Sequence, residues 1–379
     1  MIFTNKTKIK GFSKMHIVAS PAYKNEGLNP YNALLYRDIE IAGHRVSEYS
    51  HKTAITKQYD IIHFHWPDGY IDVANWIKVI QRALLLAIII MVSKIKRAKL
   101  VWTVHNLEPH DAHHPKFSQW FLKQFAAVCD GFIFLTKEGS EKFASIYPAI
   151  NISNTHSKKR SAAIIPHGHY RNSYPPPIEQ LAAKELLGIP KDKSVLLFLG
   201  TIKPYKNCDG LINEFLKAKL QNTVLVIVGR VSTIEHQRKL ETLAANQPNV
   251  YIYLHRIPVN DVPLYMSAAD KVILPYKSIL NSGTLLLALS FNTPVIAPRL
   301  GAFIDLHEEL GPKWICLYEG NLNAEILTFN FNSQIQLSKK VPCPLENYDW
   351  NKITELTLKF YQELCPQLSL KMNEQRGEL

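Results

Sequence analysis

A stretch in the second half of the chain, residues 276–298 (YKSILNSGTLLLALSFNTPVIAP), combines residue types that bind phosphate. It is typical of a strand end, a polar turn and an apolar helix that leads into another buried strand. Asn281 or Ser282 can cap this helix by accepting from a backbone N–H, and Gly283 lets a ligand approach the first turn because it has no Cβ. A helix start of this kind binds anions, most often phosphate. An ordinary capped helix in an α/β sheet fits the same residues equally well.

A second stretch, GTIKPYKN at residues 200–207, follows another buried strand. Lys203 and Lys206 can neutralise a diphosphate, because a flexible ammonium group pairs well with localised negative charge. Two solvated loop lysines are the alternative. The stretch is not a Walker phosphate loop, and no G-x-G-x-x-G follows a strand, so a nicotinamide dehydrogenase is not expected.

Both stretches need a scaffold, and strand-like and helix-like segments alternate along the whole chain. Such alternation predicts parallel sheets with helices on both faces, an α/β fold. In the first half we predict strands at 15–20, 60–66, 99–106, 130–136 and 162–168, and helices at 29–43 (Asn29 as cap, Pro30 as first helical residue), 70–96, 115–128 and 137–147. In the second half we predict strands at 194–200, 223–229, 249–255, 271–276, 293–298 and 313–319, and a final amphipathic helix at 350–364.

The alternation is interrupted at residues 171–190, where three consecutive prolines, 175–177, can continue neither a helix nor a central strand. A chain of 379 residues is also long enough for two domains. We therefore predict a first domain over residues 1–170, a linker over 171–190, a second domain over 191–347 and a terminal helical segment over 348–379.

Composition narrows the class of protein. The chain is 46% hydrophobic and 20% charged, as soluble globular proteins are. Five scattered cysteines, none spaced C-x-x-C, argue for reduced thiols in the cytoplasm, and the basic N-terminus lacks the apolar segment of a secretion signal. Residues 1–170 carry 22 lysines and arginines against 12 acidic residues, whereas residues 171–379 carry 22 against 20. The basic first half suggests an anionic surface partner, either lipid headgroups or nucleic acid.

The order of the motifs resembles a known family. The segments LGTIKPYKN, VIVGR, YMSAADKVILPY and NSGTLLLALSFNTPVIAP, within residues 199–298, are similar to the donor half of GT-B glycosyltransferases. With DIIHFHWPDG, TVHNLEPHD and IPHGHY in the first half, the chain most resembles the xanthan-type β-mannosyltransferases, which use GDP-mannose and a lipid-linked acceptor. The resemblance implies an acceptor-binding and a donor-binding Rossmann-like domain whose parallel sheets face each other across a cleft. It also implies a C-terminal helix that returns to the N-terminal domain.

The resemblance also assigns donor-site residues. Lys206 would hold the donor diphosphate, and Ser282, Gly283 and Thr284 would supply backbone and hydroxyl donors to it. The segment 255–257 would border the nucleotide base. The full expected donor site consists of Gly200, Thr201, Lys203, Lys206, Arg230, His255, Arg256, Ile257, Tyr276, Asn281, Ser282, Gly283 and Thr284.

One departure from the family pattern bears on stereochemistry. Retaining GT-B enzymes usually carry a Glu-x7-Glu motif across the phosphate-binding helix, but the corresponding residues here are Ile279 and Leu287. A second cation for the phosphates would then be Lys203, Arg230 or Arg299. The missing acids favour an inverting transfer.

An inverting transfer needs a general base that takes the proton of the acceptor hydroxyl. Asp68 and Glu108 follow predicted strand ends in the first half and are preferred over Asp111, with a helix-capping role as the alternative for each. His105 would contact the donor sugar or phosphate, or have a structural role. The expected acceptor-binding residues are Asn29, Tyr31, His65 and Trp66.

Four histidines, at positions 105, 110, 113 and 114, lie close enough in the sequence to suggest a metal site. No D-x-D pair is present, and GT-B enzymes commonly meet the leaving-group charge with basic residues and helix starts. We therefore expect no metal and no cofactor.

The segment 82–99 contains ten consecutive apolar residues, from Ala83 to Val92. This run is shorter than the ~20 residues that cross a bilayer. It is interpreted either as a buried helix or, because basic residues surround it, as a helix that attaches to an anionic membrane. These basic residues are Lys78, Arg82, Lys94, Lys96, Arg97 and Lys99.

The sequence thus predicts an inverting, metal-independent hexosyltransferase in exopolysaccharide or glycolipid synthesis. Its expected partners are a nucleotide-sugar donor, GDP-mannose by resemblance, and a saccharide or polyprenyl-diphosphate-linked acceptor at the inner face of the cytoplasmic membrane. No RNA- or DNA-binding motif is present, so nucleic acid is not an expected partner. The alternatives are a GT-B-fold sugar-nucleotide epimerase and a non-catalytic subunit that binds a nucleotide sugar or nucleic acid.

Overall fold

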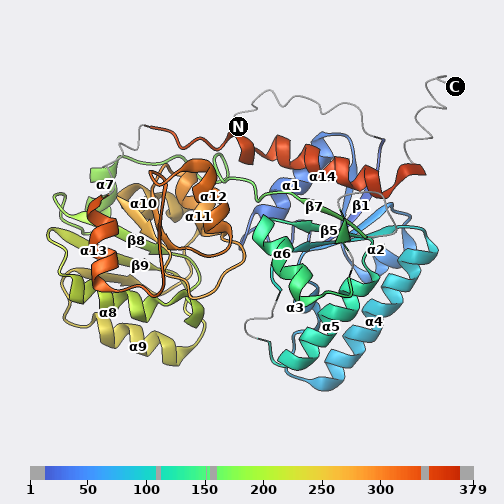
Figure 1. Cartoon of the computed structure of the whole chain (residues 1–379), viewed down its shortest axis with the longest axis horizontal. Coiled ribbons are helices and arrows are strands. Elements are labelled where there is room, and N and C mark those ends of the chain that lie inside the picture. Colours follow the sequence, from blue (N-terminus) through green and yellow to red (C-terminus); the bar gives the residue numbers. More distant parts are fainter. Residues whose placement is uncertain (1–12, 108–111, 151, 154–159, 334–340, 368–379) are drawn as a thin grey trace. The chain divides into compact units, whose positions relative to one another are not determined.

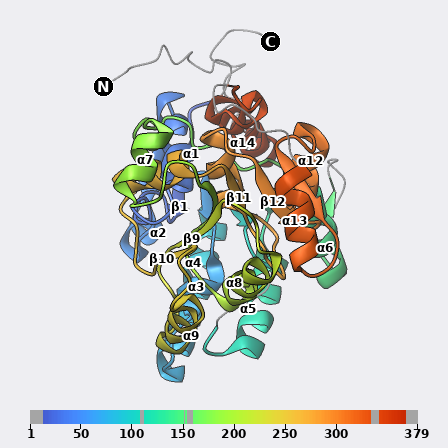
Figure 2. The same ribbon diagram turned by 90° about the vertical axis from the view of Figure 1, so that its left-hand side faces the viewer.

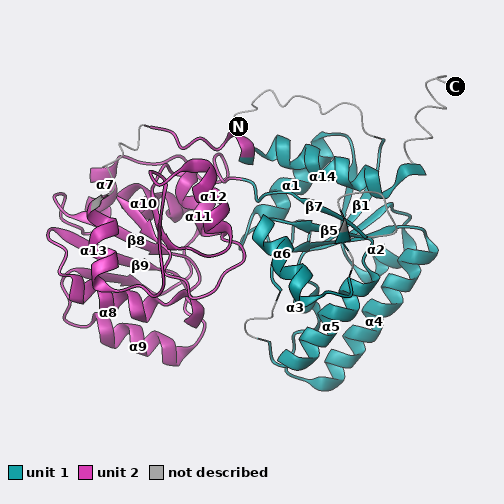
Figure 3. Cartoon of the chain, in the orientation of Figure 1, with its two compact units in different colours: residues 1–168, 348–379 teal, residues 169–347 magenta. Residues whose placement is uncertain are grey.

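The structure is a computed structural model, and it describes residues 13–107, 112–150, 152–153, 160–333 and 341–367. The chain forms two compact units (Figure 3), one made of residues 1–168 and 348–379 and the other of residues 169–347. Each unit has its own parallel β-sheet with helices packed around it (Figure 1), as the alternating pattern of the sequence predicted. The predicted α/β class is confirmed.

The first unit is built on a seven-stranded sheet in the order β2-β1-β3-β4-β5-β7-β6. Its strands are β1 (His16–Ser20), β2 (Arg45–Glu48), β3 (Ile61–Phe64), β4 (Lys99–Val104), β5 (Gly131–Phe134), β6 (Ile152–Ser153) and β7 (Arg160–Ile164). Strands β3 and β5 are buried on both faces, which explains their nearly continuous apolar sequences. Because β2 and β3 lie on opposite sides of β1, the loops after β1 and β3 diverge and leave room for a ligand.

Seven helices of the described residues belong to this unit. They are α1 (Tyr31–Ile41), α2 (His51–Thr56), α3 (Pro67–Ile71), α4 (Trp76–Ile95), α5 (Pro115–Val128), α6 (Lys137–Ile146) and α14 (Trp350–Leu364). The helix predicted at 70–96 was wrong as a single element, because residues 72–75 separate α3 from α4. Asn75 begins α4 by accepting from the backbone N–H of Lys78 at 3.1 Å.

The last helix, α14, packs against α1 of the first unit (Figures 1 and 3). Its buried face includes Leu358 and Tyr361, as the amphipathic spacing predicted. Gly131 at the start of β5 makes room for it, since a Cβ there would lie 2.8 Å from the ring of Phe360 and 2.7 Å from Leu364. The predicted return of the C-terminal helix to the first domain is therefore confirmed.

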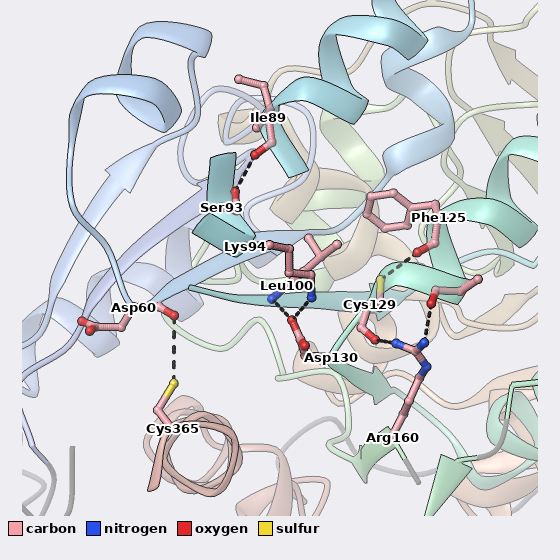
Figure 4. Close-up of polar contacts among 11 residues, drawn as sticks. Asp60, Ile89, Ser93, Lys94, Leu100, Phe125, Cys129, Asp130, Arg160 and Cys365 are labelled. Atoms are coloured by element: carbon pink, nitrogen blue, oxygen red, sulfur yellow. Dashed lines mark hydrogen bonds and ion pairs between the residues drawn. The ribbon is translucent and has the colours of Figure 1, made fainter. Parts of the chain in front are cut away.

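Polar contacts tie the amino-terminal ends of the strands to nearby helices in the first unit (Figure 4). Asp130, just before β5, accepts from the backbone N–H of Leu100 at 2.7 Å and pairs with Lys94 of α4 at 2.5 Å. Arg160, at the start of β7, donates to the carbonyl oxygen of Cys129 after α5. These contacts lie at the edge of the sheet opposite to the strand ends that bind ligands in such folds, so they support the scaffold.

The second unit has a six-stranded sheet in the order β10-β9-β8-β11-β12-β13. Its strands are β8 (Ser194–Leu199), β9 (Thr223–Val228), β10 (Val250–Tyr253), β11 (Lys271–Ile273), β12 (Val295–Pro298) and β13 (Ile315–Tyr318). Counted from β8, this is the order 3-2-1-4-5-6 of dinucleotide-binding folds. The order reverses between β8 and β11, so the carboxyl ends of these two strands are where a ligand is expected.

The helices of the second unit are α7 (Gln180–Leu186), α8 (Cys208–Ala218), α9 (Ile234–Ala244), α10 (Val262–Ala268), α11 (Gly283–Ser290), α12 (Ala302–Leu310) and α13 (Ala324–Ser333). In this unit, α8 to α12 connect consecutive strands, whereas α7 precedes β8 and α13 follows β13. Helix α8 packs against α9 and α13 (Figure 2), and α7 packs against α10 (Figure 1). Residues 171–190 are therefore part of this unit and not a separate linker: Ile178 donates to Ser267 Oγ at 3.1 Å, and the Gln180 amide donates to Asp270 at 3.0 Å.

Candidate active site

Two chemically distinct groups of the second unit meet at the carboxyl end of β8. Gly200 follows β8 with a φ of +135°, a conformation that residues with side chains rarely adopt. A Cβ placed on Gly200 would lie 3.2 Å from Thr284 Oγ1 and 3.5 Å from Lys206 Nζ. The structure thus brings together three residues of the expected donor site, with a hydroxyl group and an ammonium group beside one glycine.

Lys206 is a half-buried cation. It ends a short 3₁₀ helix, Pro204–Lys206, and its Nζ lies 5.1 Å from the ring centroid of Tyr276, within the range of a cation–π contact. Burial lowers the pKa of the Lys206 ammonium group, and the titratable groups around it in the described part of the chain include Lys203 but no carboxylate. A cation partly removed from water without an anionic neighbour costs free energy, and a bound phosphate would supply the missing charge.

Helix α11 begins at the same place. Ser282 is its cap, since Ser282 Oγ accepts from the backbone N–H of Leu285 at 3.2 Å, which decides between the two residues that the sequence left open. The buried hydroxyl group of Tyr276 lies next to the side chains of Ser282 and Thr284, and burial raises its pKa. Because β8 and β11 are adjacent, the helix start and Lys206 lie at the reversal point of the sheet. This arrangement is suited to an anionic ligand.

The remaining residues expected in the donor site lie on the loops after β8, β9 and β10. Since β9 lies between β8 and β10, these loops follow one another along the edge of the sheet. Their exposed or half-buried side chains are those of Thr201, Lys203, Arg230, His255, Arg256 and Ile257. Arg299, considered for a second phosphate contact, pairs instead with Glu319 at 2.7 Å between Nε and Oε1. Lys203 and Arg230 remain as candidates for that contact.

One glycine of this region was missed as a site residue. Gly229 follows β9 with a φ of +149°, and a Cβ there would lie 1.9 Å from the carbonyl oxygen of Gly200. The loops after β8 and β9 are therefore in direct backbone contact. The signal in the sequence was that a glycine directly follows each of the two apolar strands, SVLLFLG and TVLVIVG.

In the first unit, aromatic side chains gather at the carboxyl ends of the strands. Trp66 stacks on His105 with the ring centroids 4.4 Å apart. Tyr31, the first residue of α1, makes edge contacts with His65 and His105 at 5.8 and 5.2 Å and lies 4.5 Å from the ring of His167. Three residues expected to bind the acceptor, Tyr31, His65 and Trp66, thus form one cluster with His105.

A buried series of hydrogen bonds behind this cluster was missed. The hydroxyl group of Tyr36 lies 2.8 Å from His63 Nδ1 and 2.7 Å from His65 Nε2, and His65 Nδ1 lies 3.1 Å from His105 Nε2. At its other end, His63 Nε2 lies 2.7 Å from Thr103 Oγ1. The signal was the H-x-H and T-x-H spacing on neighbouring strands, because residues two apart in a strand point to the same face.

These histidines are neutral at pH 7. Burial lowers the pKa of His63 to about 3 and that of His167 to about 4. The pKa values of His65 and His105 lie well below the ordinary value, first because of burial and then because other histidines are close by. A neutral imidazole carries one N–H and one bare nitrogen, so each ring donates at one nitrogen and accepts at the other.

The expected general bases have different outcomes. Asp68 lies in the first turn of α3 and is half-buried. It follows Pro67 and Trp66, and the ring of Trp66 stacks on His105. Glu108 lies outside the described residues.

Asn29, expected to bind the acceptor, uses its side-chain oxygen to accept from the backbone N–H of Tyr31 at 3.0 Å, and Pro30 occupies the cap position of α1. Asn29 therefore shapes the start of α1.

The other sequence-adjacent histidines have partners away from His105. His113 Nδ1 contacts Asp72 at 2.9 Å, and the ring of His114 stacks on Trp76 at 4.0 Å. His110 lies outside the described residues. Within the described ranges, no three or more His, Cys, Asp or Glu side chains are grouped so as to hold a metal ion.

Known proteins share both the sequence and the fold. Residues 180–317 match the family model described as Glycosyl transferases group 1. The chain is 28% identical over 358 residues to GDP-mannose:glycolipid 4-beta-D-mannosyltransferase of Xanthomonas campestris pv. campestris, which covers 94% of this chain and 95% of the relative. It is 25% identical over 252 residues to D-inositol 3-phosphate glycosyltransferase of Xylanimonas cellulosilytica, which covers 64% of this chain and 56% of that protein.

Solved structures share the fold at lower identity. A glycosyltransferase from Rickettsia africae superposes with a TM-score of 0.64 at 14% identity and covers 93% of this chain and 99% of its own. Anabaena HepE in complex with UDP and glucose superposes with a TM-score of 0.59 at 15% identity and covers 97% of this chain and 100% of its own. The fold is that of the GT-B glycosyltransferases. The segment that matches the group 1 glycosyltransferase model lies within the second unit of this fold.

Proposed function

We propose that this enzyme transfers mannose from GDP-mannose, with inversion at the anomeric carbon, to a saccharide carried on a lipid. The observation that supports this most is the half-buried Lys206 beside the start of α11, which can meet the charge of a diphosphate leaving group. The donor and the acceptor class come from the name of the Xanthomonas relative, which aligns over 94% of this chain.

In the proposed reaction, the oxygen of an acceptor hydroxyl attacks the anomeric carbon while the bond from that carbon to the diphosphate oxygen breaks. The proton of the hydroxyl passes to a carboxylate, for which Asp68 and Glu108 are the candidates. Negative charge develops on the departing diphosphate. Lys206, the backbone N–H groups of Gly283 and Thr284, and the hydroxyl group of Thr284 would stabilise that charge.

One feature of α11 supports inversion, and one feature of the first unit supports the proposed acceptor contacts. Leu287 lies buried in α11 where retaining relatives would carry an acid, so no carboxylate is present there to grip the donor. In the first unit, Trp66, His65 and Tyr31 provide flat rings and ring nitrogens at the strand ends. We propose that these groups contact the acceptor saccharide, with His105 toward the donor sugar.

The proposal is tested by incubating the purified protein with GDP-mannose and extracted lipid-linked saccharide. The expected products are GDP and a β-linked mannoside, whose configuration is read by NMR. A thermal-shift series with GDP-, UDP-, dTDP- and ADP-sugars should show the largest rise in Tm with GDP-mannose, because a ligand that binds the folded state stabilises it. An α-linked product would overturn inversion. Conversion of the donor without acceptor would indicate the epimerase.

We propose that α4 attaches the first unit to a membrane surface. Its exposed apolar side chains recur every three or four residues along the whole helix and so form one stripe. They include Ile77, 68% exposed, and Ile95, 75% exposed. The complete stripe consists of Trp76, Ile77, Ile80, Leu84, Ile88, Met91 and Ile95. Only 22% of the most apolar part of α4 is buried, which contradicts the interpretation as a buried core helix.

By length and composition alone, this 20-residue helix is apolar enough to cross a membrane. However, Val79, Leu86 and Ile89 are fully buried within the first unit, on the face opposite to the stripe. Insertion of α4 across a bilayer would expose the core that these residues cover. We therefore propose that α4 lies along the surface with its stripe among the lipid chains.

Charge supports an anionic surface. Helices α4 and α5 contain no acidic residue, and they carry five basic residues. Of these five, Lys94 forms an ion pair with Asp130. Lys96, which directly follows α4, donates to three carbonyl oxygens at the end of α2. The exposed basic residues that remain on the two helices are Lys78, Arg82, Lys116 and Lys123. Such residues attract anionic headgroups, which would bring a lipid-linked acceptor to the cytoplasmic face of the membrane and beside the first unit.

A further inference from the structure

Behind His105 lies a buried array of hydrogen-bonded side chains, in which the position of the proton on one side chain determines its position on the next. Thr103, His63, Tyr36, His65 and His105 are joined in series by contacts of 2.7, 2.8, 2.7 and 3.1 Å. Each interior member, either a neutral imidazole or a phenol, has one polar hydrogen and therefore donates on one side and accepts on the other. Taken on their own, these four hydrogen bonds therefore all point in the same direction along the array.

That direction decides the tautomer of His105. When the bonds point toward His105, His65 donates from Nδ1 and the proton of His105 lies on its own Nδ1. When they point away, the proton of His105 lies on Nε2 and is donated to His65. The array therefore determines whether a given ring nitrogen of His105 donates to a sugar oxygen or accepts from a sugar hydroxyl.

The array is completed by a residue from the far end of the chain. The hydroxyl group of Tyr361, on α14, lies 2.6 Å from His63 Nδ1, the nitrogen that also contacts Tyr36, so the two hydroxyl groups and this nitrogen together determine which way Tyr36 donates. It also lies next to the hydroxyl group of Tyr36. His63, Tyr36 and Tyr361 are all 0% exposed, so water does not compete for these bonds. Polar groups held in this way are strongly ordered by one another.

We propose that Tyr36 and Tyr361 are positioning residues for His105, because their hydroxyl groups hold the array in one direction and so present one tautomer of His105 at the carboxyl end of β4. The proposal rests on the proposed function, since it takes His105 as a sugar contact. It gives the returning helix α14 a part in the site of the unit against which it packs.

The first test compares Tyr36→Phe with Tyr59→Phe. Tyr59 is a matched control: it is buried in the same unit, and its hydroxyl group contacts the Ala54 carbonyl oxygen at 3.0 Å and Ser93 at 2.9 Å, away from the array. Both changes remove one buried phenol hydroxyl. Tyr36→Phe should lower kcat about tenfold with the KM for the sugar nucleotide changed less than about twofold, since it removes part of a positioned polar contact. Tyr59→Phe should leave both unchanged. Equal kcat values in the two variants would overturn the proposal.

The second test asks whether Tyr36 acts through His105. In a His105→Asn background, Tyr36→Phe should cause no further loss of kcat, because the group that it positions is already gone. An additional tenfold loss there would show that Tyr36 acts by another route and would overturn the proposal. If Tyr36→Phe does not fold, Tyr361→Phe takes its place in the same cycle, since it keeps the ring that packs in the core.

A readout that needs no activity separates this proposal from the proposed function. In ¹⁵N-histidine NMR spectra, His105 should show a single tautomer in the wild-type protein and a mixture in Tyr36→Phe. A mixture in the wild-type protein would overturn the array as a tautomer lock even if mannose is transferred. A single tautomer in a protein that transfers no sugar would instead overturn the proposed function and leave the array in place.

Discussion

The Nζ atom of Lys206 lies 5.1 Å from the centre of the Tyr276 ring, and both residues follow adjacent strands, β8 and β11, at the point where the strand order reverses. The aromatic face contacts the ammonium group in a half-buried position where the described residues supply no carboxylate. In the free protein this arrangement costs stability, and under the proposed function it would stabilise a bound diphosphate. The charge of Lys206 would therefore favour the binding of a diphosphate and disfavour folding.

This opposition leads to a prediction for Lys206→Met, which keeps the apolar stem against Tyr276 and removes the charge. The kcat/KM for the sugar nucleotide should fall by about 100-fold, because a preorganised contact to the leaving group is lost. The free energy of unfolding should stay equal or rise, because a half-buried cation without an ion-pair partner is removed. Lys313→Met, at an exposed lysine of the same unit, should change neither quantity. Unchanged kcat/KM in Lys206→Met would refute the donor site.

The apolar stripe of α4 predicts binding to anionic vesicles. The protein should float with phosphatidylglycerol-containing vesicles, less with phosphatidylcholine alone, and less as salt is raised, because headgroup attraction is screened. The double change Leu84→Glu/Ile88→Glu should weaken this binding on the order of 100-fold, since two apolar side chains and a favourable charge balance are lost. The control is Ile234→Glu/Leu186→Glu, at apolar residues 54% and 71% exposed on the second unit. Equal flotation of both double variants would exclude α4 as the membrane surface.

The sequence predicted those features that depend on local periodicity. Helix α5 at 115–128 and helix α14 at 350–364 have the predicted bounds, because apolar residues at helical spacing continue without interruption between their ends. The break at residues 72–75 was missed, because the apolar run after it extends the helical pattern and hides the cap at Asn75.

The two parts of the site differ in how far they could be predicted. The residues around Lys206 lie on short motifs after predicted strands, so the position of a motif in the sheet was enough to place them together. The Tyr36–His63–Tyr361 contacts join α1, β3 and α14, and His63 and Tyr361 are 298 residues apart. No local pattern marks such a contact. A buried tyrosine in an amphipathic helix looks like any other core residue until the partner of its hydroxyl group is known.

The neutral state of the buried histidines predicts how stability depends on pH. His63 has a pKa of about 3 in the folded protein, below the ordinary value of 6.5 that it regains in the unfolded chain. Between these two pKa values the unfolded chain binds a proton that the folded protein does not bind. The contribution of His63 to the free energy of unfolding is therefore complete above pH 6.5 and decreases as the pH falls below it. His63 alone should contribute up to about 1.4 kcal/mol per pH unit.

The measurement is urea denaturation at pH 7 and at pH 5.5. His63→Gln should reduce the loss of stability between the two pH values, although it lowers stability at both by disturbing the array. His51→Gln, at an exposed histidine of the same unit, should leave the loss as it is in the wild type. The same pH dependence in all three proteins would show that His63 is not held neutral by folding.

The docking of α14 predicts a large cost for one added methyl group. In Gly131→Ala the new Cβ would lie 2.7 Å from Leu364 Cδ1 and 2.8 Å from the Phe360 ring, closer than real Cβ contacts allow, so α14 must shift away from β5. The expected loss is about 1–3 kcal/mol of unfolding free energy, as for other overpacked cores. Gly69→Ala is the control, because no atom lies within 4 Å of its Cβ position in α3, and alanine there should be neutral or slightly stabilising.

Adding Leu364→Ala to Gly131→Ala should recover part of the loss if the clash with α14 is its cause. Equal stability of Gly131→Ala and Gly69→Ala would mean that α14 does not hold this position, and Tyr361 would then lose its place in the array behind His105.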